Sequence, residues 1–113
     1  MGKSIMEDTS VAVVLSTAPS TEIATEISRT LVEEGLVACA NVLPPMLSIY
    51  RWKDAIQSEP EVQMILKTAV TRIPELRERL TVLHPYDVPE FLELDVAGGL
   101  PQYLAWIGTS TTT

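Results

Sequence analysis

The sequence predicts an α+β fold in which two strand–helix–strand halves share one antiparallel sheet. Two observations lead to this prediction: apolar runs with the periodicity of strands recur along the chain, and segments with helical periodicity separate them. The length of 113 residues suits one domain with a core of its own. We expect that domain over residues 10–108, with a disordered leader over residues 1–9 and a frayed tail over residues 109–113.

The first strand and the first helix follow from local signals. Residues 11–16 form a continuous, largely β-branched run, which is typical of a strand in the middle of a sheet. Ser20 is a favoured helix N-cap, and Gly35 is a favoured residue just after a helix. A helix over residues 20–34 would carry its apolar stripe on Ile23, Ile27 and Leu31.

A long hairpin occupies the middle of the chain. Residues 36–43 have the pattern of a strand that Pro44 and Pro45 interrupt, and alternation then resumes as far as Trp52. Two prolines in one strand belong at an edge or a bulge, because they donate no ladder hydrogen bond. After a turn region over residues 53–60, the returning strand 61–68 would place one face toward the core through Val62, Met64 and Leu66.

The second half repeats the first. We expect Thr71 to cap a helix that ends near Leu83, a loop over residues 84–90, a strand over residues 91–96 and a short helix that opens near Pro101. This order predicts a ferredoxin-like βαββαβ sandwich with a long kinked hairpin and a short C-terminal helix. The hairpin leaves strand edges that another subunit can pair.

Composition excludes several classes of protein. Apolar residues make up 46% of the chain and the formal net charge is −7, so we expect a globular protein that binds neither nucleic acid nor an anionic membrane surface. A single cysteine cannot form an internal disulfide, which predicts a reducing compartment, by default the cytoplasm. No phosphate-binding glycine loop, thiol-redox pair or zinc-protease motif occurs, and we predict that the protein is not an enzyme.

The segment from His84 to Glu90 is the strongest candidate for a site. It holds the only histidine, followed by Pro85, Tyr86 and Pro89, so proline rings restrict the backbone around an imidazole and a phenol. Imidazole is a common metal ligand. A position near a helix C-terminus also stabilises a protonated histidine without any ligand, and the sequence leaves both readings open.

Other residues have a structural and a functional reading. Cys39 lies in a small-residue apolar strand and is either a buried small hydrophobe or a soft ligand for copper or zinc. Tyr50 and Trp52 alternate onto one face of the hairpin, as packing or as the wall of a pocket. The charged side chains of the returning strand are a solvated face or part of a cleft: Glu59, Glu61 and Lys67.

Taken together, five ordered segments resemble the CutA family of divalent-cation tolerance proteins. They are residues 36–42, 48–52, 59–68, 84–90 and 103–106, and the similarity extends from Val11 to Ile107. The resemblance implies a ferredoxin-like fold, a homotrimer similar to PII-type signalling proteins, and copper binding in some members. It also implies a ligand cleft between subunits, at positions that match Cys39, Tyr50, Trp52, Glu59, Glu61, Lys67, His84 and Tyr86.

Two positions depart from the copper-linked members of that family. They carry a cysteine where this chain has Ser16 and a second histidine where it has Leu83. The remaining metal-ligand candidates are His84 and Cys39, so any copper site should be weak. We therefore expect a trimeric divalent-cation tolerance protein that binds copper. The alternative is a PII-like module that binds a small anion in clefts between subunits, with Lys67 supplying the positive charge.

Overall fold

The computed structural model describes residues 10–111 and confirms the predicted order of elements. Its strands and helices are β1 (Val11–Ala18), α2 (Thr21–Glu33), β2 (Cys39–Val42), β3 (Met46–Trp52), β4 (Ala55–Ala69), the 3-10 helix η1 (Val70–Arg72), α3 (Ile73–Leu83), β5 (Leu92–Asp95) and α4 (Pro101–Ser110).

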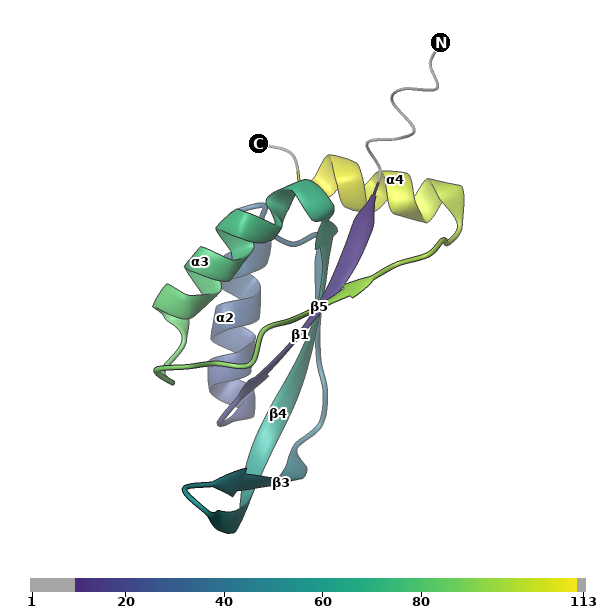
Figure 1. Ribbon diagram of the computed structural model, residues 1–113. Helices are drawn as coiled ribbons and strands as arrows, with labels where there is room; N and C mark the ends of the chain where they lie inside the picture. The colour runs from purple at the N-terminus through teal and green to yellow at the C-terminus, as the bar shows by residue number, and fades with distance from the viewer. Residues whose placement is uncertain (1–9, 112–113) are drawn as a thin grey trace.

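The sheet has the strand order β2-β4-β1-β5, and every neighbouring pair is antiparallel. Helices α2 and α3 lie against one face of the sheet, as Figure 1 shows, and this is the ferredoxin-like arrangement. The first half of β4 extends beyond the body and pairs only with β3. This hairpin makes the molecule long, with principal extents of 56 × 25 × 23 Å.

The core lies between the sheet and the two helices. Val14 of β1 and Met64 and Leu66 of β4 are fully buried, in contact with the apolar stripes of α2 and α3. The intervening residues of β4, such as Ile65 and Lys67, are only half-buried on the opposite, open face. The alternation predicted for the returning strand is therefore confirmed, and it fixes which side chains reach the open face.

Helix α2 begins and ends where the sequence signals place it. The Ser20 hydroxyl accepts a hydrogen bond from the Ile23 N–H at 3.2 Å. Gly35 follows the helix with φ +74°, in the left-handed region that a side chain disfavours.

The extent of the hairpin turn and the cap of α3 were predicted wrongly. Strand β4 starts at Ala55, so the turn consists of Lys53 and Asp54 alone, with φ +49° and +64°. This is the geometry of a tight two-residue hairpin, which usually selects asparagine and glycine. Thr71 does not cap α3, because η1 precedes the helix and its N-cap is Arg72, which makes no side-chain capping hydrogen bond.

Several elements also begin or end at other residues than predicted. Strand β2 is shorter than residues 36–43, because Leu36 and Val37 turn back toward α2 and their N–H groups point to the Leu31 carbonyl. The tail does not begin at residue 109: α4 continues to Ser110, and buried Thr111 donates to the Ile107 carbonyl. Residues 1–9 and 112–113 lie outside the described part. None of the helices within residues 10–111 is long and apolar enough to cross a membrane.

Replacement of Gly35 by alanine should destabilise the protein by about 1 kcal/mol, because a Cβ strains the backbone at positive φ. The space around Gly35 is open, so the loss would come from the backbone conformation alone. Gly108→Ala is the matched control, since Gly108 lies inside α4 and its surroundings are also open. That change should be neutral or stabilising by up to about 1 kcal/mol. Chemical denaturation measures both, and equal effects would contradict the assignment.

Candidate functional site

His84 lies at the C-terminal end of α3 and is only 7% exposed. Pro85 keeps its backbone extended, with φ −83° and ψ 140°. The Nε2 atom lies 2.6 Å from the Thr17 carbonyl oxygen, and Nδ1 accepts a hydrogen bond from the Tyr86 N–H at 3.1 Å. A carbonyl oxygen requires a donor and an N–H requires an acceptor. The ring is therefore the neutral tautomer that carries its proton on Nε2.

Tyr86 connects this imidazole to the hairpin. Its ring centroid lies 4.8 Å from that of His84, and its hydroxyl donates to a carboxylate oxygen of Glu61 at 2.9 Å. Burial, with a further contribution from the Glu61 carboxylate, raises the pKa of Tyr86 to about 12. The phenol consequently stays protonated at neutral pH and acts as a donor.

A second phenol–carboxylate pair lies next to the first. The Tyr50 hydroxyl donates to Glu59 at 2.8 Å, and this hydrogen bond raises the pKa of Tyr50. Glu59 and Glu61 are two residues apart on β4 and so share a face. The charge of Glu59 also adds to the upward shift of the Tyr86 pKa, which shows that the two pairs act on each other.

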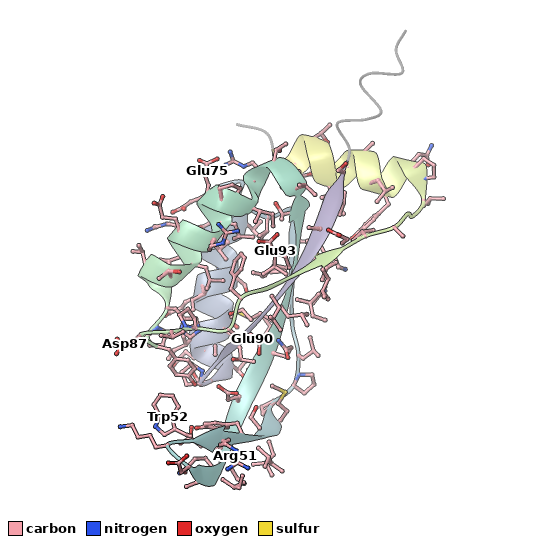
Figure 2. The ribbon with its side chains drawn as sticks, in the orientation of Figure 1. Arg51, Trp52, Glu75, Asp87, Glu90 and Glu93 are labelled. Atoms are coloured by element: carbon pink, nitrogen blue, oxygen red, sulfur yellow. The ribbon has the colours of Figure 1, made fainter. Side chains whose placement is uncertain are left out.

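Residues 84–90, which we name the strap, are also fixed at their far end. Gln63 donates through Nε2 to the Ser16 carbonyl at 2.7 Å and to the Glu90 carboxylate at 3.0 Å. The Ser16 hydroxyl donates to the Glu90 carbonyl at 2.7 Å. In Figure 2, Glu90 lies where the chain crosses the sheet, whereas Asp87 points outward at the outer end of the strap.

The remaining predicted site residues lie elsewhere in the chain. Cys39 and Lys67 are partners in the β2–β4 ladder, and within residues 10–111 Lys67 forms no ion pair. His84 contacts Thr17, whose ladder partner is Gln63, four residues or roughly 13 Å along β4 from Lys67. Trp52 is at the tip of the hairpin (Figure 2), 59% exposed, with the Lys53 ammonium 5.8 Å from its ring.

The structure thus brings five of the eight predicted site residues together. The other three, Cys39, Trp52 and Lys67, lie apart from them. One connected cluster contains Tyr50, Glu59, Glu61, His84 and Tyr86. Sequence reasoning missed Ser16, Thr17 and Gln63 as partners of the strap. The half-buried polar side chain of Gln63 on an alternating strand was a usable signal. The two backbone carbonyls that accept hydrogen bonds have no signature in the sequence.

Candidate copper ligands do not converge within the described residues of this chain. Residues 10–111 contain no group of three or more histidine, cysteine, aspartate or glutamate side chains that could hold a metal ion. Cys39 and His84 lie apart, and both ring nitrogens of His84 already have partners. A copper ion would therefore meet one donor at a time in this chain, and it would meet His84 only after a ring contact is broken.

Comparison with known proteins gives a consistent result. A family model described as "CutA1 divalent ion tolerance protein" matches residues 12–110. A Thermus thermophilus protein named "Divalent-cation tolerance protein CutA" is 44% identical over 99 residues, which cover 88% of this chain and 96% of that protein. The mouse "Protein CutA" is 42% identical over 98 residues, or 87% of this chain, which spans about half of that longer protein (55%).

Solved structures agree with the sequence comparison. The divalent cation tolerance protein from Thermus thermophilus superposes with a TM-score of 0.88 at 43% identity, over 90% of this chain and 99% of that chain. CutA from Xylella fastidiosa gives the same TM-score of 0.88 at 41% identity, over 90% and 98%.

Glu61→Gln should lower the pKa of Tyr86 from about 12 toward its ordinary value of 10, because the carboxylate stabilises the protonated phenol. Glu59→Gln is the matched control and should lower it less, since Glu59 acts on Tyr86 only through its charge. Phenolate absorbance measures both, with Tyr86→Phe identifying the signal. Equal shifts in the two variants would contradict the hydrogen-bond assignment.

The raised pKa also predicts the alkaline stability of the protein. The folded state holds the Tyr86 proton more tightly than the unfolded chain does, so this contribution is complete below pH 10 and is lost as the pH rises toward about 12. Tyr86→Phe should therefore flatten the decline of stability with pH in that interval, as measured by denaturation at a series of pH values.

Proposed function

The chain belongs to the CutA1 divalent ion tolerance family, and we propose that it acts as a homotrimer that binds copper weakly and responds to divalent metal ions. The observation that carries this proposal is the family match over residues 12–110. The exposed hairpin supports the trimer, and the hydrogen bonds of the strap support weak metal binding. The single cysteine supports action in a reducing compartment such as the cytoplasm.

The hairpin supports the trimer. Its register places Leu47, Ile49 and Ile56 on one face, and these side chains are 63%, 67% and 63% exposed. A two-stranded hairpin is marginally stable in water without further packing, and an apolar patch of this kind marks an interface. At the opposite edge of the sheet, all of β5 is exposed, including Leu92 and Leu94. A head-to-tail contact between such different surfaces gives a closed ring when its rotation closes, and we propose a ring of three copies.

The hydrogen bonds of His84 support weak metal binding. Each ring nitrogen has a backbone partner, so a copper ion must compete with an existing contact for the imidazole. Cys39 supplies the other soft donor, from a separate part of the sheet. His84 and Cys39 in different subunits of the trimer would then give each copper ion few ligands, and few ligands hold copper loosely.

A second candidate is a PII-like module that binds a small anion in a cleft between subunits. The observation that favours it is Lys67, a half-buried cation that forms no ion pair within the described residues of a chain whose net charge is −7.

We also propose that the protein binds a ligand and catalyses no reaction. The contacts of the His84 ring nitrogens are with backbone atoms, so the imidazole is not paired with a nucleophile.

Light scattering behind size exclusion should give three times the chain mass of 12.4 kDa.

Trp52→Ala should weaken the trimer, because truncation of an aromatic side chain at an interface commonly costs about 3–5 kcal/mol. Trp106→Ala, on the exposed side of α4, is the control and should have a smaller effect on trimer melting. A monomer at micromolar concentration would refute the assembly, and equal small effects of both changes would place Trp52 outside the interface.

Copper should bind with an affinity low enough for an equimolar chelator to remove it, and His84→Ala should abolish what binding there is. Competitive titration of the wild type, His84→Ala and Cys39→Ala measures this. Cys39→Ala should weaken binding less than His84→Ala does. Tight, stoichiometric binding that survives His84→Ala would contradict the proposal and shift the site to Cys39 and the methionines.

A further inference from the structure

A groove lies between the C-terminal end of α2 and helix α3. Its volume is about 470 Å³, which is within the range of sites that hold small molecules. In Figure 2, Glu75 in the wall of this groove and Asp87 of the strap lie at opposite ends of α3. The groove shares no residue with the cluster of Tyr50, Glu59, Glu61, His84 and Tyr86, so it is a separate feature of the molecule.

One wall of the groove is an ion pair that joins the two helices. Arg79 of α3 donates through Nε and Nη2 to the two carboxylate oxygens of Glu34, both at 2.8 Å. These hydrogen bonds lower the pKa of Glu34, so its carboxylate stays ionised at neutral pH. Both oxygens of Glu34 are occupied by Arg79, and the pair links the end of α2 to α3.

A second ion pair in the groove is incomplete. Arg72, the N-cap of α3, has a side chain that is only 12% exposed, and its Nη1 donates to Oε1 of Glu75 at 2.6 Å. Its Nε is buried without a partner, and its Nη2 donates to none of the described residues. Oε2 of Glu75 likewise accepts no hydrogen bond within residues 10–111. Buried donors almost always have partners, so Arg72 can take a further anionic acceptor and Glu75 a further cationic donor.

The charges of the lining select the class of ligand. Two arginines and three glutamates line the groove, which gives it a net charge of −1 in a chain of net charge −7. This surplus of negative charge disfavours a simple anion, and a simple cation would leave the guanidinium of Arg72 without an acceptor. A zwitterion with adjacent opposite charges matches Arg72 and Glu75, whose own charges are adjacent. Leu36 and Val82 add apolar surface to the same lining.

We propose that this groove binds a free α-amino acid with an apolar side chain. The ligand carboxylate accepts a hydrogen bond from Nη2 of Arg72, and the ligand ammonium group donates to Oε2 of Glu75. The side chain of the ligand lies along Leu36 and Val82. The positive end of the α3 dipole adds to the attraction of the carboxylate. This binding activity goes beyond metal tolerance and depends neither on copper nor on the trimer.

The first experiment is titration of the intact protein with L-leucine, followed by calorimetry and by amide NMR shifts. The shifts should concentrate in residues 34–36 and 72–82, which border the groove. N-acetyl-L-leucine lacks the ammonium group and L-leucinamide lacks the carboxylate. Each should bind at least about tenfold more weakly than L-leucine, because a hydrogen bond between charged groups is lost. Inorganic phosphate, the probe for a simple anion site, should not shift these amides.

The second experiment uses three variants. Arg72→Gln and Glu75→Gln should each weaken L-leucine binding about tenfold. Glu75 is 62% exposed, so Glu75→Gln keeps the test valid even where Arg72→Gln disturbs folding. Arg77→Gln is the matched control and should leave binding unchanged, because Arg77 lies on the same helix and pairs with Glu93 at 2.7 Å outside the groove.

Three results would overturn the inference. They are no binding of L-leucine at millimolar concentration, binding of N-acetyl-L-leucine or phosphate in the groove as tight as that of L-leucine, and undiminished binding of L-leucine by Glu75→Gln. Copper titration and light scattering are independent measurements. Failure of this inference would therefore leave the proposed metal binding and the proposed trimer unaffected.

Discussion

The pairing of β1 with β4 organises the whole fold. Eight residues of β1 align with β4 from Val11 opposite Ala69 to Ala18 opposite Val62. One face of this ladder carries the centre of the core, and the same register sets Ser16 and Thr17 beside Gln63. The carbonyl groups of Ser16 and Thr17 then receive Gln63 and His84. Packing and the candidate site therefore share one structural origin, so a shift of this ladder would disrupt both.

The unequal lengths of the two central strands explain the exposed hairpin. Strand β4 has 15 residues and β1 has 8, so β4 extends past the end of its partner. Its overhanging part pairs with β3 alone and has no helix above it (Figure 1). Apolar side chains on that part cannot be buried within one chain. The molecule thus has a body with a core of its own and an arm whose apolar side chains stay exposed within the single chain.

Local signals predicted most of the fold, and long-range contacts account for what they did not predict. Ser20 and Gly35 act within one turn of α2, so the sequence places both ends of that helix. The turn was predicted to start at Lys53 but to continue to residue 60, because no glycine follows Asp54 to mark a two-residue turn. The neutral state of His84 was also missed. It depends on the Tyr86 N–H, which needs a lone pair on Nδ1, while the carbonyl of Thr17, 67 residues away, places the proton on Nε2. Both are backbone groups, which the sequence does not mark.

The two-residue turn at the tip restricts how this protein can diverge. Trp52 faces Ala55 across the turn, and from there each pair in the hairpin follows without a bulge to Met46 and Glu61. Side chains alternate with period two, so insertion of one residue on one arm would move its side chains beyond that point to the other face. Changes of length by an even number of residues would preserve the facing pattern. Homologous hairpins should therefore differ in length by pairs of residues, and a lineage with an odd difference should carry a compensating bulge.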